Sequence, residues 1–240
     1  MSRLPPVLFE DEHILAFDKP SGLLISPDRW DKEKENLMDE VHAHRSPDIF
    51  NAHRLDRDTS GVIVCGKTKD ALNSLCLQFE RGEVEKEYLA LVCGRPPHER
   101  GEVDQPMAED PEHPGRMKCV RHGKPAITRY ETEQAFRGWT LLRLFPQTGR
   151  THQLRVHMKA LGCPILADPW YGDGLPLVLS EFKRGYKPSL HKEHPLIARL
   201  ALHAHRLTLR HPADGRSLAI EAPIPKELRT AIRQLSRWAA

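Results

Sequence analysis

Short apolar runs separated by polar turns predict a series of strands. Residues 7–9 and 14–17 are apolar and flank a short acidic segment, which predicts two strands joined by a tight turn. Residues 62–66 form a continuous apolar run, and residues 86–93 alternate between two faces, as a half-buried strand does. The same reasoning predicts three more strands, over residues 126–132, 139–145 and 201–209.

Other segments repeat their apolar residues at helical spacing. Three helices are predicted on this basis, over residues 69–79, 150–161 and 225–238. Gly82 and Gly162 are expected to end the first two, and Pro225 begins the third. The charged segment 28–40 also suits a short helix in its C-terminal part.

Two long segments, residues 95–125 and 172–197, are rich in proline, glycine and charge and are predicted to be excursions from the fold. Neither has the composition of a linker between domains, and the chain contains no repeat of fixed period. Strand hairpins mixed with single helices favour an α+β fold. We therefore expect one domain over residues 1–240.

Composition narrows the class of protein. The chain has 240 residues, and 36 basic against 33 acidic residues give a net charge of only +3, so a polyanion would have to meet a local basic patch. The five cysteines are widely spaced and odd in number, which indicates free thiols in a reducing compartment. The sequence shows no signal peptide and no apolar run long enough to span a bilayer. We expect a cytoplasmic protein.

The densest cluster of charge lies in residues 53–61, His-Arg-Leu-Asp-Arg-Asp-Thr-Ser-Gly, directly before an apolar run. Asp56 stands between Arg54 and Arg57, and opposite charges nearby keep a carboxylate ionised. An ionised carboxylate suits a nucleophile or an electrostatic stabiliser, but not a general acid. On these residues alone a structural salt bridge, or a turn capped by Asp56, is the simpler interpretation.

Two further places offer candidate chemistry. A glycine turn leads into the predicted helix at residue 150, whose first turn carries Arg150 and His152 and would attract an anion or simply form a solvated basic face. Leu154 lies on the apolar stripe of this helix, and Arg155 lies at the edge of the stripe, where its guanidinium can reach an internal carboxylate. Tyr88, on a half-buried strand, is by itself best explained by core packing.

Metal and nucleotide sites receive little support. The pairs His42/His44 and His203/His205 each place two imidazoles close together on a strand or turn, but zinc needs three or four convergent ligands. Neither a metalloprotease helix motif nor a glycine-rich phosphate-binding motif is present. We expect no metal and no nucleotide cofactor.

Five motifs in a fixed order give the chain a resemblance to the RluA family of RNA pseudouridine synthases. The motifs are Ile-Leu-Ala-Phe-Asp-Lys-Pro-Ser-Gly at 14–22, the charged loop at 53–61, Lys-Glu-Tyr-Leu-Ala-Leu-Val at 86–92, Gly-Arg-Thr-His-Gln-Leu-Arg-Val-His at 149–157 with Gly-Cys-Pro-Ile-Leu-Ala-Asp at 162–168, and Leu-His-Ala-His-Arg-Leu at 202–207 with His211-Pro212. The resemblance implies a mixed, mostly antiparallel sheet with flanking helices and a central RNA-binding cleft.

The resemblance also implies a reaction, the isomerisation of a uridine in rRNA or tRNA to pseudouridine without a cofactor. In that reading Asp56 is the essential carboxylate, Tyr88 lies against the base and assists proton removal from C5, and Arg155 pairs with Asp56. Arg54 fills the space of the flipped base, Leu154 packs against that base, and Arg57 contributes electrostatically. Arg150 and His152 are expected to contact RNA. The target base must leave its stack, at a cost of a few kcal/mol.

Many relatives carry an N-terminal S4 domain, which we do not expect here because the first family strand begins within a few residues of Met1. RNA recognition would then fall to the catalytic domain, acting as a monomer, with residues 110–124 as an RNA-facing arm. Two competing hypotheses are a non-catalytic RNA-binding module of the same fold and, more distantly, a metal hydrolase that uses the histidine pairs. The joint presence of Asp56, Tyr88 and Arg155 favours the enzyme.

Overall fold

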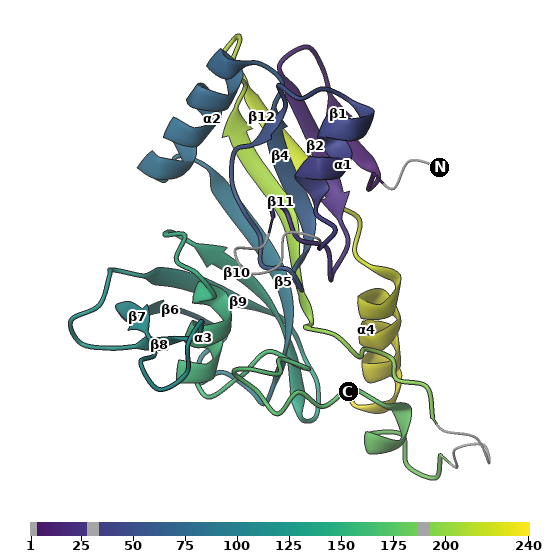
Figure 1. Cartoon of the computed structure of the whole chain (residues 1–240). Helices are drawn as coiled ribbons and strands as arrows, with labels where there is room; N and C mark the ends of the chain where they lie inside the picture. The colour runs from purple at the N-terminus through teal and green to yellow at the C-terminus, as the bar shows by residue number, and fades with distance from the viewer. Residues whose placement is uncertain (1–3, 28–33, 187–192) are drawn as a thin grey trace. The chain divides into compact units, whose positions relative to one another are not determined.

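A computed structural model describes residues 4–27, 34–186 and 193–240. The chain divides into two compact units (Figure 1). The first unit comprises residues up to 87 together with 204–223, and the second comprises residues 88–203 together with 224–240. The boundary runs through two strands, β5 (Glu85–Cys93) and β11 (Leu202–Arg210). The single domain expected from the sequence is not tested by this division and stays a prediction.

The first unit is built on an antiparallel sheet. Its strands are β1 (Val7–Glu10), β2 (Ile14–Lys19), β3 (Phe50–Asn51), β4 (Ser60–Gly66), most of β11, and β12 (Ser217–Glu221). They follow the order β1-β2-β4-β11, with β3 paired to β4 and β12 paired to β11. The predicted strand pair and the strand at 62–66 are confirmed. Strand β12 was not predicted, because its alternation is short and its burial depends on pairing with β11.

Two helices complete this unit, α1 (Leu37–His44) and α2 (Lys69–Arg81). The Thr68 hydroxyl accepts from the Ala71 amide at the start of α2, and Gly82 adopts the left-handed conformation, with φ of 72°, at its end. Helix α2 lies beside the sheet (Figure 1). Its Leu75 is buried in the apolar cluster of this unit, and Phe79 packs against that cluster. The predicted helix and its glycine stop are confirmed. Residues 28–33 of the predicted charged segment lie outside the described residues.

The second unit also has an antiparallel sheet, with strands in the order β5-β10-β9-β6. Besides β5, the strands of this sheet are β6 (Arg100–Asp104), β9 (Ile127–Ala135) and β10 (Trp139–Pro146). A separate hairpin in this unit consists of β7 (Met107–Glu109) and β8 (Met117–Cys119). The prediction of an irregular excursion over 95–125 is therefore wrong for three segments. Strand β6 forms because it pairs with β9, and β7 pairs with β8, partners that local composition does not reveal.

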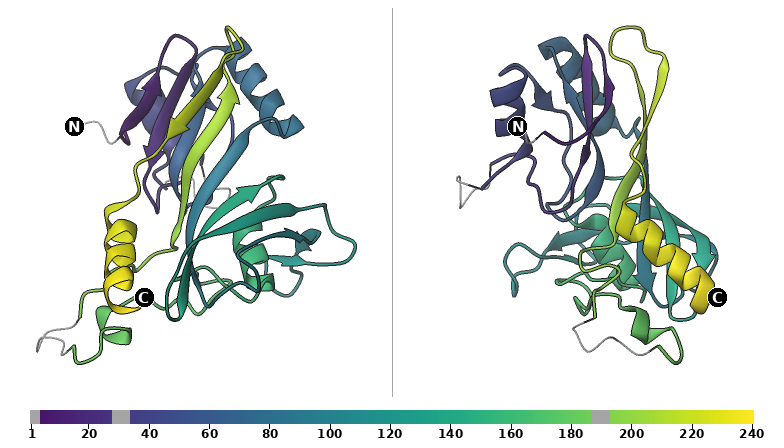
Figure 2. Two further views of the ribbon diagram at one scale, coloured as in Figure 1. Left: turned by 180° about the vertical axis from the view of Figure 1, so that it is seen from behind. Right: turned by 90° about the vertical axis from the view of Figure 1, so that its right-hand side faces the viewer.

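The helices of the second unit are α3 (Gln153–Ala160), the short 3₁₀ helix η1 (Leu179–Glu181) and α4 (Lys226–Trp238). Helix α4, yellow in Figure 2, buries Leu228, Ala231 and Leu235 in the main core of this unit. The predicted insert at 172–197 contains η1, and its residues 187–192 lie outside the described residues. The α+β class with a mostly antiparallel sheet is confirmed.

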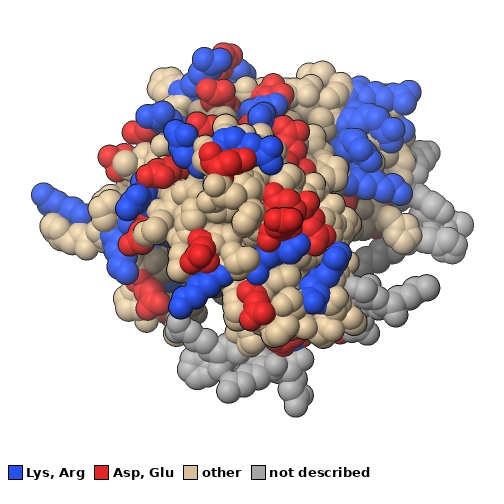
Figure 3. All heavy atoms as spheres, turned by 90° about the horizontal axis from the view of Figure 1, so that it is seen from above, with Lys and Arg blue, Asp and Glu red and all other residues tan. Residues whose placement is uncertain are grey.

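The surface carries both signs of charge. On the face in Figure 3, acidic and basic side chains intermingle over most of the area, while lysine and arginine gather at one margin. This distribution suits the small net charge and a local basic patch. No helix within the described ranges is long and apolar enough to cross a membrane. All five cysteines are free thiols.

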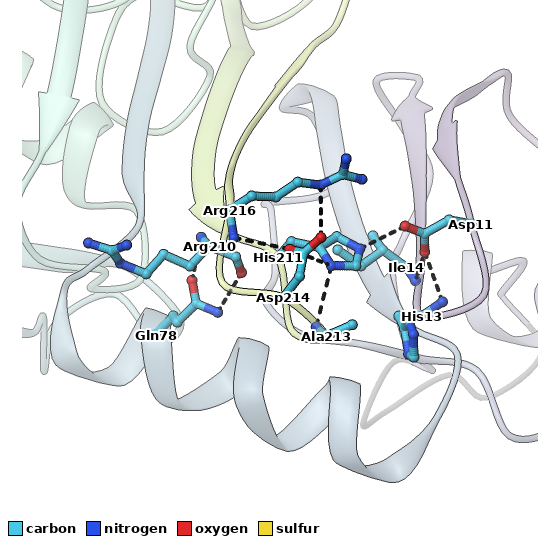
Figure 4. A network of polar contacts seen from close by, with 9 residues as sticks. All are labelled: Asp11, His13, Ile14, Gln78, Arg210, His211, Ala213, Asp214 and Arg216. Carbon is cyan, nitrogen blue, oxygen red and sulfur yellow. Dashed lines mark hydrogen bonds and ion pairs between the residues drawn. The ribbon is translucent and has the colours of Figure 1, made fainter.

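A buried histidine ties the β11–β12 hairpin to the turn between β1 and β2 in the first unit (Figure 4). His211 is 4% exposed, and its Nε2 lies 2.7 Å from Oδ2 of Asp11. The Ala213 amide donates to Nδ1 of His211, so the ring proton is on Nε2 and faces the carboxylate. The other oxygen of Asp11 accepts from the amides of His13 and Ile14.

Burial raises the pKa of Asp11, but the two amide hydrogen bonds and His211 outweigh it, so the pKa lies below its usual 3.8. An aspartate with a lowered folded-state pKa stabilises the fold above its unfolded pKa, and this contribution disappears as the pH falls through the folded-state pKa. The carboxylate of Asp11 is therefore ionised at neutral pH, and its contribution to stability is fully present above pH 3.8 and is lost as the pH falls below that value through the lowered folded-state pKa.

Replacement of Asp11 with asparagine is expected to lower the free energy of unfolding at pH 7 by about 1–2 kcal/mol, because an amide nitrogen would face the Nε2 proton of His211. Urea unfolding between pH 3 and pH 7 measures this loss, which should shrink toward acid. The exposed neighbour Glu12→Gln serves as the control. A loss that is equal at all pH values would show that the carboxylate charge contributes nothing.

Candidate active site

A buried lysine anchors the loop that carries Asp56. Lys19 is fully buried, and its ammonium donates to three backbone carbonyls, those of Pro20, Leu23 and Arg57, at 2.8–2.9 Å. The Ser21 hydroxyl donates to the carbonyl of Asp58 at 2.7 Å. The Lys-Pro-Ser-Gly turn after β2 therefore holds the charged loop from behind. The sequence identified this turn only as a strand stop and a family motif.

The charged side chains of the loop differ in their exposure to solvent. Arg54 and Arg57 are exposed, whereas Asp56 is half-buried. Arg57 Nε lies 3.2 Å from Oδ1 of Asp58, and the Thr59 amide donates to the carbonyl of Asp56. Arg57 is therefore engaged by Asp58, while the backbone around Asp56 forms a tight turn.

Gly61 ends the loop and cannot be replaced without distortion. Its φ is +115°, a conformation that side-chain-bearing residues rarely adopt. A Cβ at this position would lie 2.1 Å from the carbonyl oxygen of Ala204 on the neighbouring strand β11. The glycine thus allows close contact between β4 and β11, and this contact fixes where the loop enters the sheet.

His53, the first residue of the motif, is a structural residue. Its ring stacks on Phe79 of α2 at 4.4 Å, and its Nε2 accepts from the Val64 amide at 3.1 Å. Burial, followed by the positive charge of Lys86, lowers the pKa of His53 to about 3. The imidazole is therefore neutral at physiological pH, in agreement with its role as an acceptor.

Tyr88 lies on β5, in the second unit, opposite Leu144 of β10. It is half-buried and packs against the main core of that unit. The core packing that the sequence suggested is confirmed. Tyr88 remains partly exposed to solvent despite this packing.

Helix α3 begins three residues later than predicted. Arg150, Thr151 and His152 lie in the turn before the helix rather than in its first turn, and His152 has a φ of 55°. The reason is the Gln153 side chain, whose Oε1 accepts from the Arg150 amide and from the Thr148 hydroxyl. This tight turn replaces a helical one, so the expected anion site on the first helical turn is corrected to basic residues on the preceding turn.

Polar side chains on α3 lock it onto β9. Gln153 Nε2 donates to the carbonyl of Ile127 and to the Thr128 hydroxyl. Gln153 and Thr128 are both buried. His157 is fully buried, with Nδ1 at 2.9 Å from the Thr128 hydroxyl and Nε2 at 3.1 Å from the carbonyl of Gln105. The position of the residues between them, Leu154 and Arg155, is fixed as a result.

Arg155 forms a buried ion pair with Asp168. Nε and Nη2 of the arginine each lie 2.8 Å from one oxygen of the carboxylate, and the side chains are 4% and 0% exposed. Asp168 also accepts from the amides of Trp170 and Tyr171. Burial raises the pKa of Asp168, but Arg155 and these amides outweigh it, so the pKa stays below 3.8.

Aromatic rings enclose this ion pair. The guanidinium of Arg155 lies 5.0 Å from the ring centre of Tyr171 and 5.5 Å from that of Trp170. The Tyr171 hydroxyl accepts from the Met117 amide and lies 2.9 Å from Nδ1 of His152. Asp168 follows Ala167, which has a φ of 56°; within the described residues Ala167 and His152 are the two non-glycine residues with positive φ. Strained backbone therefore lies three residues before Arg155 and directly before its partner Asp168.

Sequence reasoning predicted that Arg155 can reach an internal carboxylate, and Asp168 is such a carboxylate. It did not single out Asp168 or Tyr171, although the apolar run 163–167 ending in an aspartate was a usable signal. The structure gathers Arg150, His152, Leu154 and Arg155 in the second unit. Asp56, Arg54 and Arg57 belong to the first unit. The pairing of Arg155 with Asp56 stays a prediction.

Among the residues that the structure describes, neither histidine pair belongs to a group with the spacing of a metal site. His42 and His44 lie on helix α1, where residues two apart do not share a face, and they contact the carbonyl of Ile49 and Glu40 respectively. In the described part of the chain, one group has metal-compatible spacing, formed by Asp110, Glu112 and His113 at the tip of the β7–β8 hairpin. Its Asp110 already contacts His113 and Lys118.

Comparison with known proteins places these motifs in a family. Residues 13–160 match the family model described as RNA pseudouridylate synthase. The chain is 42% identical over 219 residues to the dual-specificity RNA pseudouridine synthase RluA of Escherichia coli K12, covering 90% of this chain and 92% of the relative. It is 37% identical over 234 residues to the ribosomal large subunit pseudouridine synthase D of Nitrosomonas europaea, of which it spans 64%.

Solved structures agree with this assignment. Human RNA pseudouridylate synthase domain containing 4 superposes with a TM-score of 0.73 at 27% identity, covering 96% of this chain and 92% of the human one. Human RNA pseudouridylate synthase domain containing 1 superposes with a TM-score of 0.70 at 24% identity, which supports the fold. The match to the family model and the identity to RluA are together decisive: the chain belongs to the RNA pseudouridylate synthase family, and the predicted resemblance to RluA is confirmed.

Proposed function

We propose that this chain isomerises a specific uridine in structured RNA, ribosomal or transfer, with Asp56 as the essential carboxylate. The observation that carries the proposal is the family match over residues 13–160, which contains Asp56, Tyr88 and Arg155 together. The named relatives include a dual-specificity RNA enzyme and a large-subunit rRNA enzyme, so either RNA class suits this chain. We expect it to act in the cytoplasm, as a monomer and without a cofactor.

In the proposed reaction the C1′–N1 bond of the target uridine breaks and a C1′–C5 bond forms. Asp56 acts as a nucleophile, at C1′ or on the uracil ring, or it stabilises the positive charge that develops on the ribose during cleavage. The freed uracil turns and rejoins the sugar through C5. The proton then leaves C5, with Tyr88 assisting its removal, and N1 gains a proton. The half-buried position of Asp56 and the exposure of Arg54 support these roles.

Arg155 is assigned to hold the carboxylate of Asp56 in its ionised form. A guanidinium has five N–H donors, and the pair with Asp168 uses Nε and Nη2. Asp168 thereby fixes the position of the guanidinium that we assign to Asp56. A buried arginine held by an aspartate and two aromatic rings is costly to build, and buried ion pairs add little stability over apolar packing. A positioning role accounts for that cost.

RNA contacts are proposed for Arg54, Arg57, Leu154, Arg150 and His152. Arg54 takes the place of the flipped base, where a guanidinium offsets part of the unstacking cost. Residues 110–124 are proposed as a further RNA-facing arm, in which Lys118 is paired with Asp110. A non-catalytic RNA-binding module is the alternative, and the joint retention of Asp56, Tyr88 and Arg155 favours catalysis.

Replacement of Asp56 with asparagine should lower pseudouridine formation at least about 100-fold while leaving RNA binding largely intact, because the carboxylate charge is lost and the shape is kept. Tritium release from 5-³H-uridine-labelled RNA measures the reaction. The neighbouring carboxylate variant Asp58→Asn is the matched control and should retain activity. Wild-type turnover by the Asp56 variant would exclude it as the catalytic residue.

Replacement of Tyr88 with phenylalanine should slow product formation by about 100-fold, the scale of lost proton-transfer assistance, and leave the fold intact. Single-turnover kinetics measure the rate, and thermal unfolding measures the fold. Tyr130→Phe, on the buried face of β9, controls for removal of a tyrosine hydroxyl elsewhere in the same unit. An unfolded Tyr88→Phe protein would instead support a packing role alone.

Replacement of Asp168 with asparagine should destabilise the protein by about 3 kcal/mol, since it removes one partner of a buried ion pair. At saturating RNA, kcat should also fall, whereas the KM for RNA should change little, because Arg155 is displaced and the RNA surface is not. Asp173→Asn, an exposed change in the same segment, is the control. A stable Asp168 variant with normal kcat would refute the positioning role.

A further inference from the structure

A pocket of about 330 Å³ lies wholly within the second unit, between the β7–β8 hairpin, helix α3 and the segment after Asp168. Its principal walls are Arg116 and Lys118 from the hairpin, Lys159 from the helix, and the aromatic pair Trp170 and Tyr171. Neither Asp56, Tyr88 nor Arg155 lines it. Its volume is at the lower end of the range for small-molecule sites, which suits an occupant as small as one nucleotide.

The aromatic wall is fixed in place before any ligand binds. Tyr171 is buried, and its hydroxyl is held by the Met117 amide at 2.8 Å. Trp170, by contrast, is 39% exposed, and its backbone is held by Asp168. Arg116 donates to the Trp170 carbonyl, and its guanidinium lies 5.7 Å from the centre of the indole ring. The pocket thus offers an indole and a guanidinium plane, surfaces on which unpaired RNA bases stack.

The charge in the pocket is net positive. Three cations line it, Arg116, Lys118 and Lys159, against the single carboxylate of Asp110. Asp110 is already engaged, with Lys118 at 3.0 Å and His113 at 2.9 Å. Among the described residues that line the pocket, the one carboxylate pairs with Lys118 and not with Arg116 or Lys159. Together they suit a phosphate group.

We propose that this pocket binds one unpaired nucleotide of the RNA substrate, other than the target uridine. Its base stacks on Trp170 and Arg116, and its phosphate lies between Arg116 and Lys159. The inference rests on the proposed function for the identity of the polymer. It adds a second anchoring point, between the β7–β8 hairpin and helix α3, that would select RNAs carrying an unpaired nucleotide besides the target uridine.

Trp238 provides a matched control. It is 37% exposed against 39% for Trp170, and two cations, Lys183 and Arg237, lie 4.6 Å and 4.8 Å from its ring centre, so its exposure and its number of cationic neighbours match those of Trp170. It lies at the end of α4 and does not line the pocket. A difference between the two tryptophans would therefore report the pocket and not a general affinity of exposed indoles for RNA.

The test measures binding of fluorescein-labelled hexauridylate and of structured rRNA fragments by anisotropy, in an Asp56→Asn background so that no turnover occurs. Trp170→Ala should raise the Kd about 5- to 150-fold, the loss expected for one stacked base. Trp238→Ala should leave it unchanged. Uridine monophosphate should compete for the labelled hexamer more strongly than uridine or inorganic phosphate alone, because both parts of the nucleotide are recognised.

A second variant guards against misfolding of Trp170→Ala. Arg116→Gln should weaken binding and lower the slope of log Kd against log salt by the equivalent of about one phosphate contact. The control Arg129→Gln changes an exposed arginine of β9 that pairs with Glu102 of β6, and it should leave both unchanged. Equal affinities for Trp170→Ala and Trp238→Ala with an unchanged salt slope for Arg116→Gln would overturn the pocket proposal. Wild-type protein that forms no pseudouridine in any cellular RNA would overturn the proposed function, whatever the pocket binds.

Discussion

The buried ion pair between Arg155 and Asp168 is the constraint on which the second unit is organised. A guanidinium that is 4% exposed has left water, and it is tolerated only because a carboxylate accepts two of its hydrogen bonds and two aromatic rings cover it. To supply these partners, the chain after residue 162 returns to α3, adopts a positive φ at Ala167 and places two amides on Asp168. The backbone strain at Ala167 and the desolvation of two charges are therefore concentrated around this ion pair.

Other buried polar side chains fix the position of loops and helices through hydrogen bonds. Lys19 donates to three carbonyls and holds the Asp56 loop in the first unit, while Gln153 and His157 fasten α3 to β9 in the second. In each case a side chain that is expensive to bury has all of its partners supplied by the protein. Lys19, Gln153 and His157 are thus motif residues whose buried side chains fix loops and a helix, whereas Arg54 and Arg57 of the Asp56 loop are exposed.

This division explains where sequence reasoning succeeded. Strands and helices with strong periodicity were predicted well, as at 69–79 with its glycine stop, because each depends on a local pattern of burial. Segment 95–125 was predicted as irregular, yet it contains β6, which pairs with β9 farther along the chain, and the β7–β8 hairpin, whose strands pair within the segment without a periodic signal. The start of α3 was misplaced for a local reason. A glutamine side chain, which carries no periodic signal, captured the amide of Arg150.

The sequence by itself determined the family, the α+β class and the identity of the candidate reactive residues, because ordered motifs and local periodicity are properties of the chain. It also indicated that Arg155 would meet an internal carboxylate. Only the tertiary structure decided that Asp168 is such a partner, that Tyr171 ties the hairpin to the turn before α3, and that Trp170 lines a basic pocket. Those contacts join residues 13 to 54 positions apart, and their energy depends on burial and geometry that no local pattern encodes.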